Sequence, residues 1–330
     1  MIRWLFIFFL IVFSHPAHAQ PLKAQAAHVV LISFDGLRPD AITELGEDKA
    51  PAFYQMMREG AFTLNARTDH DLTVTLPNHA CMITGYPVKG DYGHHLTENV
   101  LMPDKTIHDF AGRHIDSIFD TLRKNNAHSA MLSSKLKFNI YQNSFPIDTV
   151  ALTDYDDIQT LENFIKLTRT GLPDFVFLHF AGADRVGHKE GWIVSSDSSY
   201  MAQVETLDDY LKLALRAIQL KDELKDSTVV IVTADHGGEG MSHSDPKNPL
   251  DYTVPFIIWG KAVAKGADLY KINADRRRDP LEQRIPYDQK DQPIRNGDAA
   301  NVALSVLGLP SVEGSTIGNE KPLKIHGGNN

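Results

Sequence analysis

HVVLISF, residues His28–Phe34, runs directly into Asp35 and Gly36, and this stretch decides the fold. A continuous apolar run of this length predicts a strand that is buried on both faces of a parallel sheet. Asp35 would then stand at the carboxyl edge of the sheet, where ligands bind in this class of fold. Similar strands are expected at Ser129–Ser133, Phe175–Phe180, Val229–Thr233 and Thr253–Trp259.

Helical patterns alternate with these strands. The alternation predicts an α/β fold with a single large, mostly parallel sheet that carries helices on both faces, within one domain of residues 20–330. The charged, proline-containing segment 265–295 interrupts the order, and we interpret it as a surface insertion or small cap. Helices are expected at Ala52–Glu59, Ile115–Asn125, Ile158–Thr168, Met201–Ile218 and Ala299–Leu307.

The first 19 residues have the pattern of a secretory signal peptide. A basic Arg3 precedes the apolar run Trp4–Phe13, and the box Ala17-His18-Ala19 comes just before Gln20. A membrane anchor is the alternative, but the run is too short to cross about 30 Å of hydrocarbon comfortably. We therefore expect secretion, with a periplasmic location in a Gram-negative source and no stable membrane anchor after cleavage.

The balance of charge is acidic, with 42 Asp and Glu residues against 33 Lys and Arg. No long basic block follows the leader, so neither a nucleic-acid polymer nor an anionic membrane is favoured as a partner. Cys81 is the only cysteine, which excludes an intramolecular disulfide and leaves stability to a packed core. The oligomeric state is left open by these observations.

Aspartates and histidines gather near the predicted strand ends. Their carboxylate oxygens and neutral imidazoles are suitable ligands for zinc and similar divalent metals. Each one alone has a simpler explanation as a cap or a turn residue, but their joint order is specific. Six such ligands suffice for two metals if a shared substrate or nucleophile completes the coordination, and two metals can stabilise the attacking and leaving oxygens of a displacement at phosphorus. The six are Asp35, Asp184, His188, Asp235, His236 and His243.

The candidate nucleophile lies in TVTLPNH, residues Thr73–His79. Pro77 suits the first turn of a helix that continues through Ile83. The Thr75 hydroxyl at that helix start would face free amide donors, which favour an oxyanion and an incoming phosphate. The alternative is that Thr75 only caps the helix.

These motifs occur in an order that resembles a known family. FDGLRPD (34–40), TLPNH (75–79), DRVGH (184–188), ADHGG (234–238), QPIRNGD (292–298) and LGLP (307–310) resemble the alkaline phosphatase superfamily. More narrowly, they resemble its type I phosphodiesterase/nucleotide pyrophosphatase branch. The resemblance covers nearly the whole chain after the leader. It implies an alkaline-phosphatase-like catalytic domain that hydrolyses small-molecule phosphoric esters with the help of metals.

The resemblance also implies roles for individual residues. Thr75 would attack phosphorus and bridge toward the second of two divalent metals, with zinc the expected ion. Asn99 would hold a non-bridging phosphoryl oxygen, although the family's His-Gly-Ile spacing has become His95-Leu96-Thr97 here. His326 competes with His243 as a ligand, but His243 precedes a core strand and is favoured. The first metal would be held by Asp184, His188 and His243, and the second by Asp35, Asp235 and His236.

Several alternatives remain at this level. Lys135 and Lys137 are either a solvated pair or a substrate-binding pair, similar to the lysines that grip the substrate carboxylate in phosphonoacetate hydrolases. Diesters or nucleotide pyrophosphates are favoured as substrates, and a phosphomonoester or phosphonate is the second choice. A non-catalytic protein that binds metal or phosphoesters belongs to a different functional class. A sulfatase is disfavoured, because Cys81 lacks the C/S-x-P-x-R setting. His79, His94, His95 and His179 are expected to be structural, with His94 or His95 as an alternative lining of the pocket.

Overall fold

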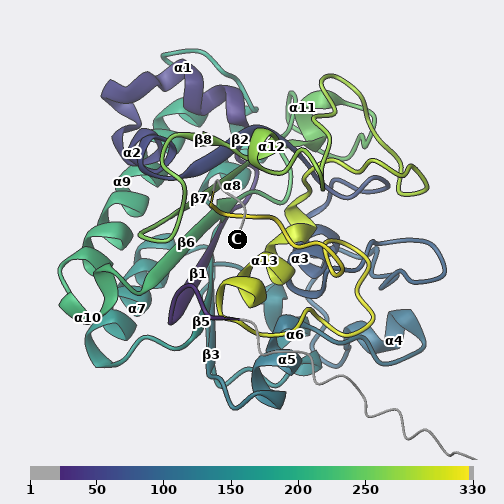
Figure 1. Ribbon diagram of the computed structural model, residues 1–330. Coiled ribbons are helices and arrows are strands. Elements are labelled where there is room, and N and C mark those ends of the chain that lie inside the picture. Colours follow the sequence, from purple (N-terminus) through teal and green to yellow (C-terminus); the bar gives the residue numbers. More distant parts are fainter. Residues whose placement is uncertain (1–22, 327–330) are drawn as a thin grey trace, which may run out of the picture.

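The computed structural model describes residues 23–326, so the predicted signal peptide lies outside the described part of the chain. Its centre is an eight-stranded sheet with the spatial order β4-β3-β5-β1-β6-β7-β2-β8 (Figure 1). The strands are β1 His28–Phe34, β2 Ala61–Arg67, β3 Ser129–Ser133, β4 Thr149–Leu152, β5 Phe175–Phe180, β6 Thr228–Thr233, β7 Thr253–Gly260 and β8 Ala267–Asp268.

The sheet is parallel except at β7. Strand β1 pairs in parallel with β5 on one side and with β6 on the other, and β3 continues the parallel order toward β4. Strand β7 pairs antiparallel with both β6 and β2, so it alone runs against the other strands of the sheet. The start of β7 therefore lies at the edge where β1, β5 and β6 end.

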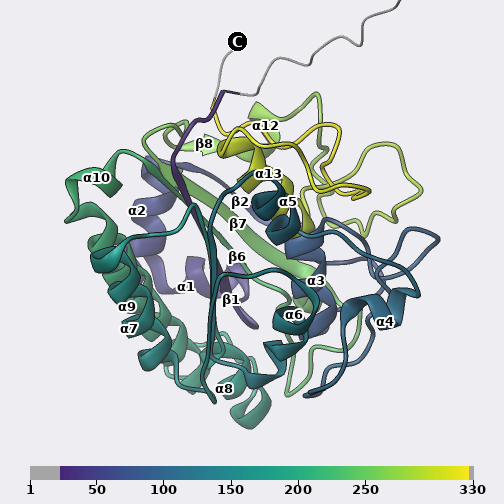
Figure 2. The ribbon, with the colours of Figure 1, turned by 90° about the horizontal axis from the view of Figure 1, so that it is seen from below.

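Helices cover both faces of the sheet. Figure 2 shows α1, α2, α7 and α9 on one face and α3, α5, α6 and α13 on the other. This arrangement confirms the predicted fold class. The helices are α1 Pro39–Lys49, α2 Pro51–Glu59, α3 Thr75–Thr84, α4 Ile107–Ala111, α5 Ile118–Lys124, α6 Asn139–Ser144, α7 Asp157–Thr170, α8 Gly182–Glu190, α9 Ser199–Gln219, α10 Asp222–Lys225, α11 Pro249–Tyr252, α12 Leu269–Ile272 and α13 Ala299–Val306.

Side-chain caps set where several helices begin. Ser117 and Asp120 form a reciprocal capping box, so α5 starts at Ile118 and not at Ile115 as its apolar pattern predicts. Ser198 caps α9 by accepting a hydrogen bond from the Met201 amide. Short polar residues thus define these boundaries more closely than the hydrophobic period does.

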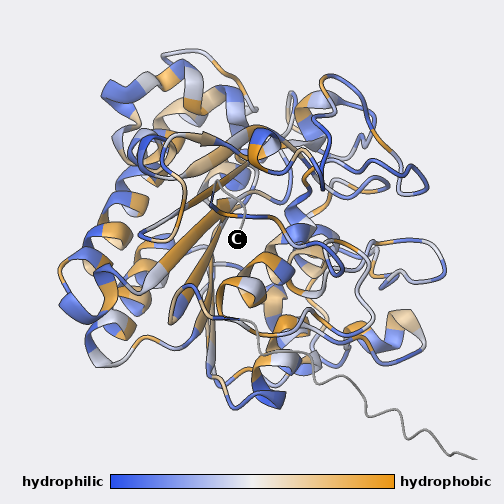
Figure 3. Ribbon diagram, in the orientation of Figure 1, coloured by the Kyte–Doolittle hydropathy of each residue, from blue (hydrophilic) through white to orange (hydrophobic). Residues whose placement is uncertain are grey.

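The core lies on the two faces of the central strands, where the hydropathy colours of Figure 3 are most apolar. Every residue of β5 and β6 is buried, as is β1 from Val29 to Phe34. The outer strand β4 is only partly buried, which explains why its sequence lacks the strong apolar run of the central strands. Within residues 23–326, no helix is both long and apolar enough to cross a membrane.

Segment 265–295 is attached to the β2 side of the sheet. It begins with β8 and α12 and then continues without regular structure. The Arg67 guanidinium at the end of β2 donates to the Leu281 carbonyl at 2.6 Å, and the Tyr287 hydroxyl donates to the Asp69 carboxylate at 2.8 Å. These contacts hold the segment beside the loop that leads into α3.

Candidate active site

The predicted site residues lie together at one edge of the sheet. Asp35 follows β1, Asp184 lies in α8 just after β5, and Asp235 and His236 follow β6. His243 precedes β7, and because that strand is antiparallel its start lies at the same edge. The reversed direction of β7 is what brings His243 to the other residues.

The first cluster contains Asp184, His188 and His243, whose ligand atoms all lie within 4.8 Å of one another. The two Nε2 atoms of the histidines are 3.1 Å apart, and His188 Nε2 lies 3.3 Å from Asp184 Oδ1. Both Nδ1 atoms are already bound, since His188 donates to the Met241 carbonyl and His243 to the Thr73 carbonyl. Both Nε2 atoms therefore face a common point, as metal-binding imidazoles do.

The second cluster surrounds His236. Its Nε2 lies 3.4 Å from Asp35 Oδ1 and 3.2 Å from Asp235 Oδ2, while its Nδ1 donates to the Gly237 carbonyl at 2.8 Å. Ligand atoms of Asp35, Asp184 and His236 also lie within 4.8 Å of one another, so the two clusters adjoin. The Thr75 hydroxyl lies 3.5 Å from His236 Nε2.

Three carboxylate oxygens at these clusters are buried and have no hydrogen-bond partner: Asp35 Oδ1, Asp184 Oδ1 and Asp235 Oδ2. Each lies near a histidine Nε2. A buried carboxylate oxygen without a partner is costly, and buried charges are normally paired or bound to a metal. The donor set and its orphaned oxygens therefore fit divalent metal ions.

Burial sets the protonation of the histidines. It lowers the pKa of His236 to about 3, with a further contribution from His243, and it also lowers the pKa of His243 itself. The pKa of His188 is raised by its hydrogen bond to Asp184. His236 and His243 are thus neutral near pH 7, which is the form that binds metals.

The carboxylates differ in charge. Burial alone would raise the pKa of Asp35 and Asp184, but Lys135 and neighbouring histidines hold both below the usual value. Burial and the charge of Asp35 raise the pKa of Asp235 well above the usual range. Without a further cation, the site therefore keeps two of its three carboxylates ionised.

Lys135 differs from both sequence interpretations. It is only 2% exposed, so a solvated position is wrong for it. Its Nζ lies 2.7 Å from Asp35 Oδ2 and 2.6 Å from Asp184 Oδ2, which directs the ammonium at the protein's own carboxylates and not at a substrate. Lys137 lies elsewhere, with its Nζ 2.7 Å from Asn99 Oδ1.

Thr75 is the first residue of α3, but it does not cap the helix. The N-cap is Val74, and no side-chain cap is formed. The capping alternative is therefore wrong. Asn99 also reaches this helix start, where its Oδ1 accepts from the Leu76 amide at 3.2 Å. Thr75, Asn99 and Lys137 are thus brought together, although Asn99 was the weakest of the motif matches.

Two further residues support the clusters, and only Trp192 was not singled out from the sequence. His179, expected to be structural, donates from Nε2 to Asp35 Oδ2 at 2.9 Å. Trp192 packs its ring against His188 and His243, with centroids 5.0 and 5.7 Å apart. A Cβ on Gly187 would lie 2.3 Å from this ring and one on Gly238 would lie 2.4 Å from it. Gly187 in DRVGH and Gly238 in ADHGG therefore indicate, already in the sequence, that a large side chain packs against these motifs.

The other histidines differ in their distance from the clusters, and His79 and His179 form a further group with Asp35 whose atoms lie within 4.8 Å of one another. Among residues 23–326, His326 belongs to none of the groups whose atoms could hold a metal. His94 is buried beside the Cys81 sulfur at 3.4 Å. His79 donates to the Thr75 carbonyl at 2.8 Å and accepts from Ser33, so it supports the backbone of the nucleophile candidate.

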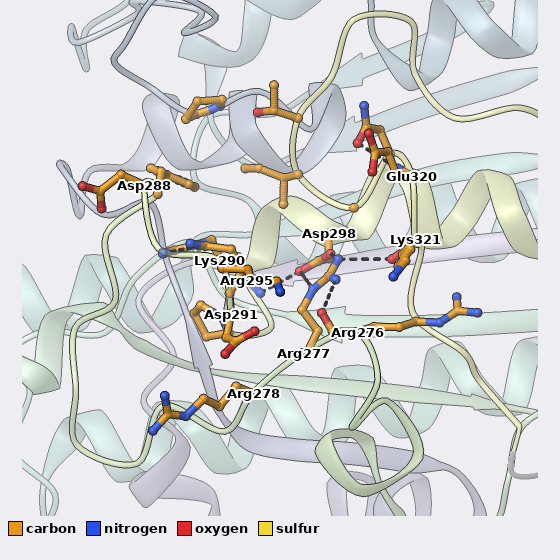
Figure 4. A pocket seen from close by; sticks show the side chains of 18 of the residues that line it. Arg276, Arg277, Arg278, Asp288, Lys290, Asp291, Arg295, Asp298, Glu320 and Lys321 are labelled. Atoms are coloured by element: carbon orange, nitrogen blue, oxygen red, sulfur yellow. Dashed lines mark hydrogen bonds and ion pairs between the residues drawn. The ribbon is translucent and has the colours of Figure 1, made fainter.

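A separate cavity of about 1320 Å³ lies between segment 265–295 and the loop around Gly318. None of the predicted site residues lines it. Figure 4 shows Arg277 and Asp298 facing each other there, and the buried Arg277 guanidinium forms an ion pair with the Asp298 carboxylate. The cavity is therefore distinct from the candidate active site.

Comparisons with known proteins agree with the fold. A structure of inactive murine ectonucleotide pyrophosphatase/phosphodiesterase 5 in complex with AMP superposes with a TM-score of 0.64 at 14% identity, covering 90% of this chain and 100% of the murine one. An alkaline phosphatase superfamily protein from Vibrio parahaemolyticus gives a TM-score of 0.62 at 17% identity, covering 92% of this chain and 71% of that one.

Sequence comparisons extend this result. A phosphopentomutase from Clostridium novyi (strain NT) is 27% identical over 160 residues, which is 47% of this chain. The match spans only 35% of the phosphopentomutase's length. Residues 29–289 match the sequence profile of the family described as type I phosphodiesterase/nucleotide pyrophosphatase. The resemblance of the motifs to this family is thereby confirmed, and the protein belongs to the type I phosphodiesterase/nucleotide pyrophosphatase family.

Proposed function

We propose that the protein is an exported, metal-dependent hydrolase of small phosphoric esters, with Thr75 as the nucleophile. One observation carries this proposal. The Thr75 hydroxyl lies at the start of a buried helix, 3.5 Å from His236, beside two adjoining Asp/His clusters with orphaned carboxylate oxygens. Family membership supports the same chemistry.

The two clusters would hold two divalent metals. Asp184, His188 and His243 would bind one, and Asp35, Asp235 and His236 the other, with Thr75 close to the second. Mixed imidazole and carboxylate donors favour zinc. When bound, such ions lower the pKa of a hydroxyl group and stabilise negative charge on oxygens around phosphorus.

The chain's own groups would position the substrate. Thr75 Oγ1 would lose its proton and attack phosphorus, while the bond from phosphorus to the leaving oxygen breaks and that oxygen takes up a proton. Water would then attack phosphorus, which breaks the bond to Oγ1, restores the Thr75 hydroxyl and releases the phosphate product. Asn99 Oδ1 is already engaged by the Leu76 amide and Lys137, which leaves the Asn99 amide group to donate to a phosphoryl oxygen. Burial of this helix start excludes water from the attacking hydroxyl.

Phosphodiesters or nucleotide pyrophosphates are the proposed substrate class, supported by the family and by the AMP complex of the murine neighbour. A phosphomonoester or phosphonate hydrolase is the second candidate. Lys137 favours this candidate, because its ammonium lies at Asn99 and would attract an additional negative charge on the substrate.

The experiment compares bis-p-nitrophenyl phosphate, p-nitrophenyl phosphate and phosphonoacetate as substrates of the mature protein. We expect hydrolysis of the diester that is lost with a chelator and restored by Zn²⁺. Thr75→Ala should lower kcat by about a thousand-fold or more with unchanged metal content and melting temperature. Wild-type kcat in that variant would exclude Thr75 as the nucleophile, and activity on none of the substrates would favour a binding protein.

A further inference from the structure

The buried ammonium of Lys135 contacts one carboxylate from each cluster. Asp184 belongs to the first cluster and Asp35 to the second, and their Oδ2 atoms lie 2.6 and 2.7 Å from Lys135 Nζ. Lys135 follows β3, whose neighbour β5 separates it from β1. The side chain therefore reaches past the end of β5 to join the residues that follow β5 and β1.

The two oxygens of each carboxylate have different surroundings. Asp35 Oδ2 accepts from both Lys135 and His179, and Asp184 Oδ2 accepts from Lys135. Their Oδ1 atoms are the orphaned ones, near the Nε2 atoms of His236 and His188. Lys135 thus binds the Oδ2 atom of each carboxylate, and the Oδ1 atom of each is left for another cation.

We propose that Lys135 is a positioning residue: its ammonium is a fixed internal cation that joins the two clusters and orients one oxygen of each toward its histidines. It thereby keeps the metal-free site folded, so that metals can bind to a site that is already arranged. This inference rests on the proposed metal site, but not on the identity of the substrate. It also replaces the substrate-binding role that the sequence suggests for Lys135.

Electrostatics explain why the cation is needed. Two carboxylates packed side by side in a buried site repel each other, and removing the buried cation that pairs with both is strongly destabilising. A bound divalent metal would compensate the same charges. The contribution of Lys135 should therefore be largest in the metal-free protein and smaller in the metal-loaded protein.

The test compares Lys135→Met with Lys137→Met, a matched control on the same segment whose ammonium contacts the Asn99 amide and no carboxylate. After chelation, Lys135→Met should melt about 5–10 °C below the wild type, and saturating Zn²⁺ should close most of that gap. Lys137→Met should show a smaller loss that Zn²⁺ does not change. Equal losses, or equal responses to Zn²⁺, in the two variants would overturn the proposal.

A second variant keeps the test decisive if Lys135→Met is too unstable to purify without metal. Adding Asp184→Asn removes one of the two charges that Lys135 compensates, so the double variant should be more stable than Lys135→Met when both are metal-free. A double variant that is less stable would contradict the proposed role. This comparison needs no turnover, so a failure of the proposed hydrolase activity would be seen separately in the substrate experiment.

Discussion

At the scale of single residues, the candidate site depends on which atom of each side chain is already engaged. The Nδ1 atoms of His188, His236 and His243 donate to backbone carbonyls, which leaves each Nε2 for the centre of the site. In Asp35 and Asp184, likewise, Oδ2 accepts a hydrogen bond and Oδ1 has no partner. Residue types alone indicate a metal site, whereas these hydrogen bonds show which atom of each side chain is free to bind a metal.

The choice between His243 and His326 can be tested at this scale. His243→Ala should lower metal affinity at the first cluster by at least about ten-fold, because it removes a direct ligand. His326→Ala should bind metal like the wild type, since its side chain lies outside the clusters. Elemental analysis and metal titration measure both. A reversed result would move the ligand to His326.

Lys137 should make substrate binding depend on pH. Burial, together with the nearby charge of Lys135, lowers the pKa of Lys137 to about 8. Its ammonium is therefore present below pH 8 and is lost as the pH rises through 8. We expect KM for phosphomonoesters to rise about ten-fold across this range, because a charge-assisted contact is lost. In Lys137→Met this step should be absent, and a step that persists would assign it to another group.

At the scale of elements, the site depends on the close approach of β1 and α8. Gly36 follows β1 and Asp35, and a Cβ on Gly36 would lie 3.0 Å from the Cα of Asp184. The Asp184 amide also donates to the Asp35 carbonyl at 3.0 Å. Backbone contact between these two elements therefore sets the distance between Asp184 of the first cluster and Asp35 of the second.

Gly36→Ala tests this contact, with Gly46→Ala as its control. Both glycines have a positive φ, 74° and 68°, so both substitutions carry a similar conformational cost of about 1 kcal/mol. Only Gly36 has α8 within reach, because nothing lies within 4 Å of a Cβ on Gly46. We expect Gly36→Ala to lose about 1–2 kcal/mol more in denaturant unfolding and to bind metal more weakly. Equal losses of unfolding free energy in the two variants would show that α8 shifts to accommodate the added methyl group without cost.

At the scale of the whole molecule, one mixed sheet collects residues from four separate chain segments at one edge. The helices on its two faces bury both sides of β1, β5 and β6, so the strands that carry the site lie within the packed core. Segment 265–295 adds a second, charged cavity without contributing any of the predicted site residues. The sheet and its helices therefore build the candidate active site, and the cavity beside segment 265–295 is separate from it.

Export is a prediction about the whole chain. The signal peptide should be removed after Ala19, so that the secreted protein begins at Gln20. Intact-mass analysis of periplasmic or secreted protein measures this directly. A mass that includes residues 1–19 would favour a retained membrane anchor.

The sequence by itself determined the central strands, the family, and the helices α2, α3, α5, α7, α9 and α13. β1, β3 and β5 have the predicted boundaries, because a strand that is buried on both faces has a continuous run of apolar residues in its own sequence. The motifs FDGLRPD, DRVGH and ADHGG are equally local, since each lies at or just after the end of a strand. The strands β2, β4 and β8 were not predicted, because their partial burial leaves a weak pattern.

Only the tertiary structure decided how these parts meet. The direction of β7 depends on which neighbours it pairs with, and that pairing brings His243 to the site edge. The residues next to Lys135 in the chain predict an exposed side chain, yet it is buried, because its ammonium pairs with Asp35, which follows β1, and with Asp184 in α8. Contacts between residues so distant in sequence leave no local periodicity, so they could not be predicted from the sequence alone.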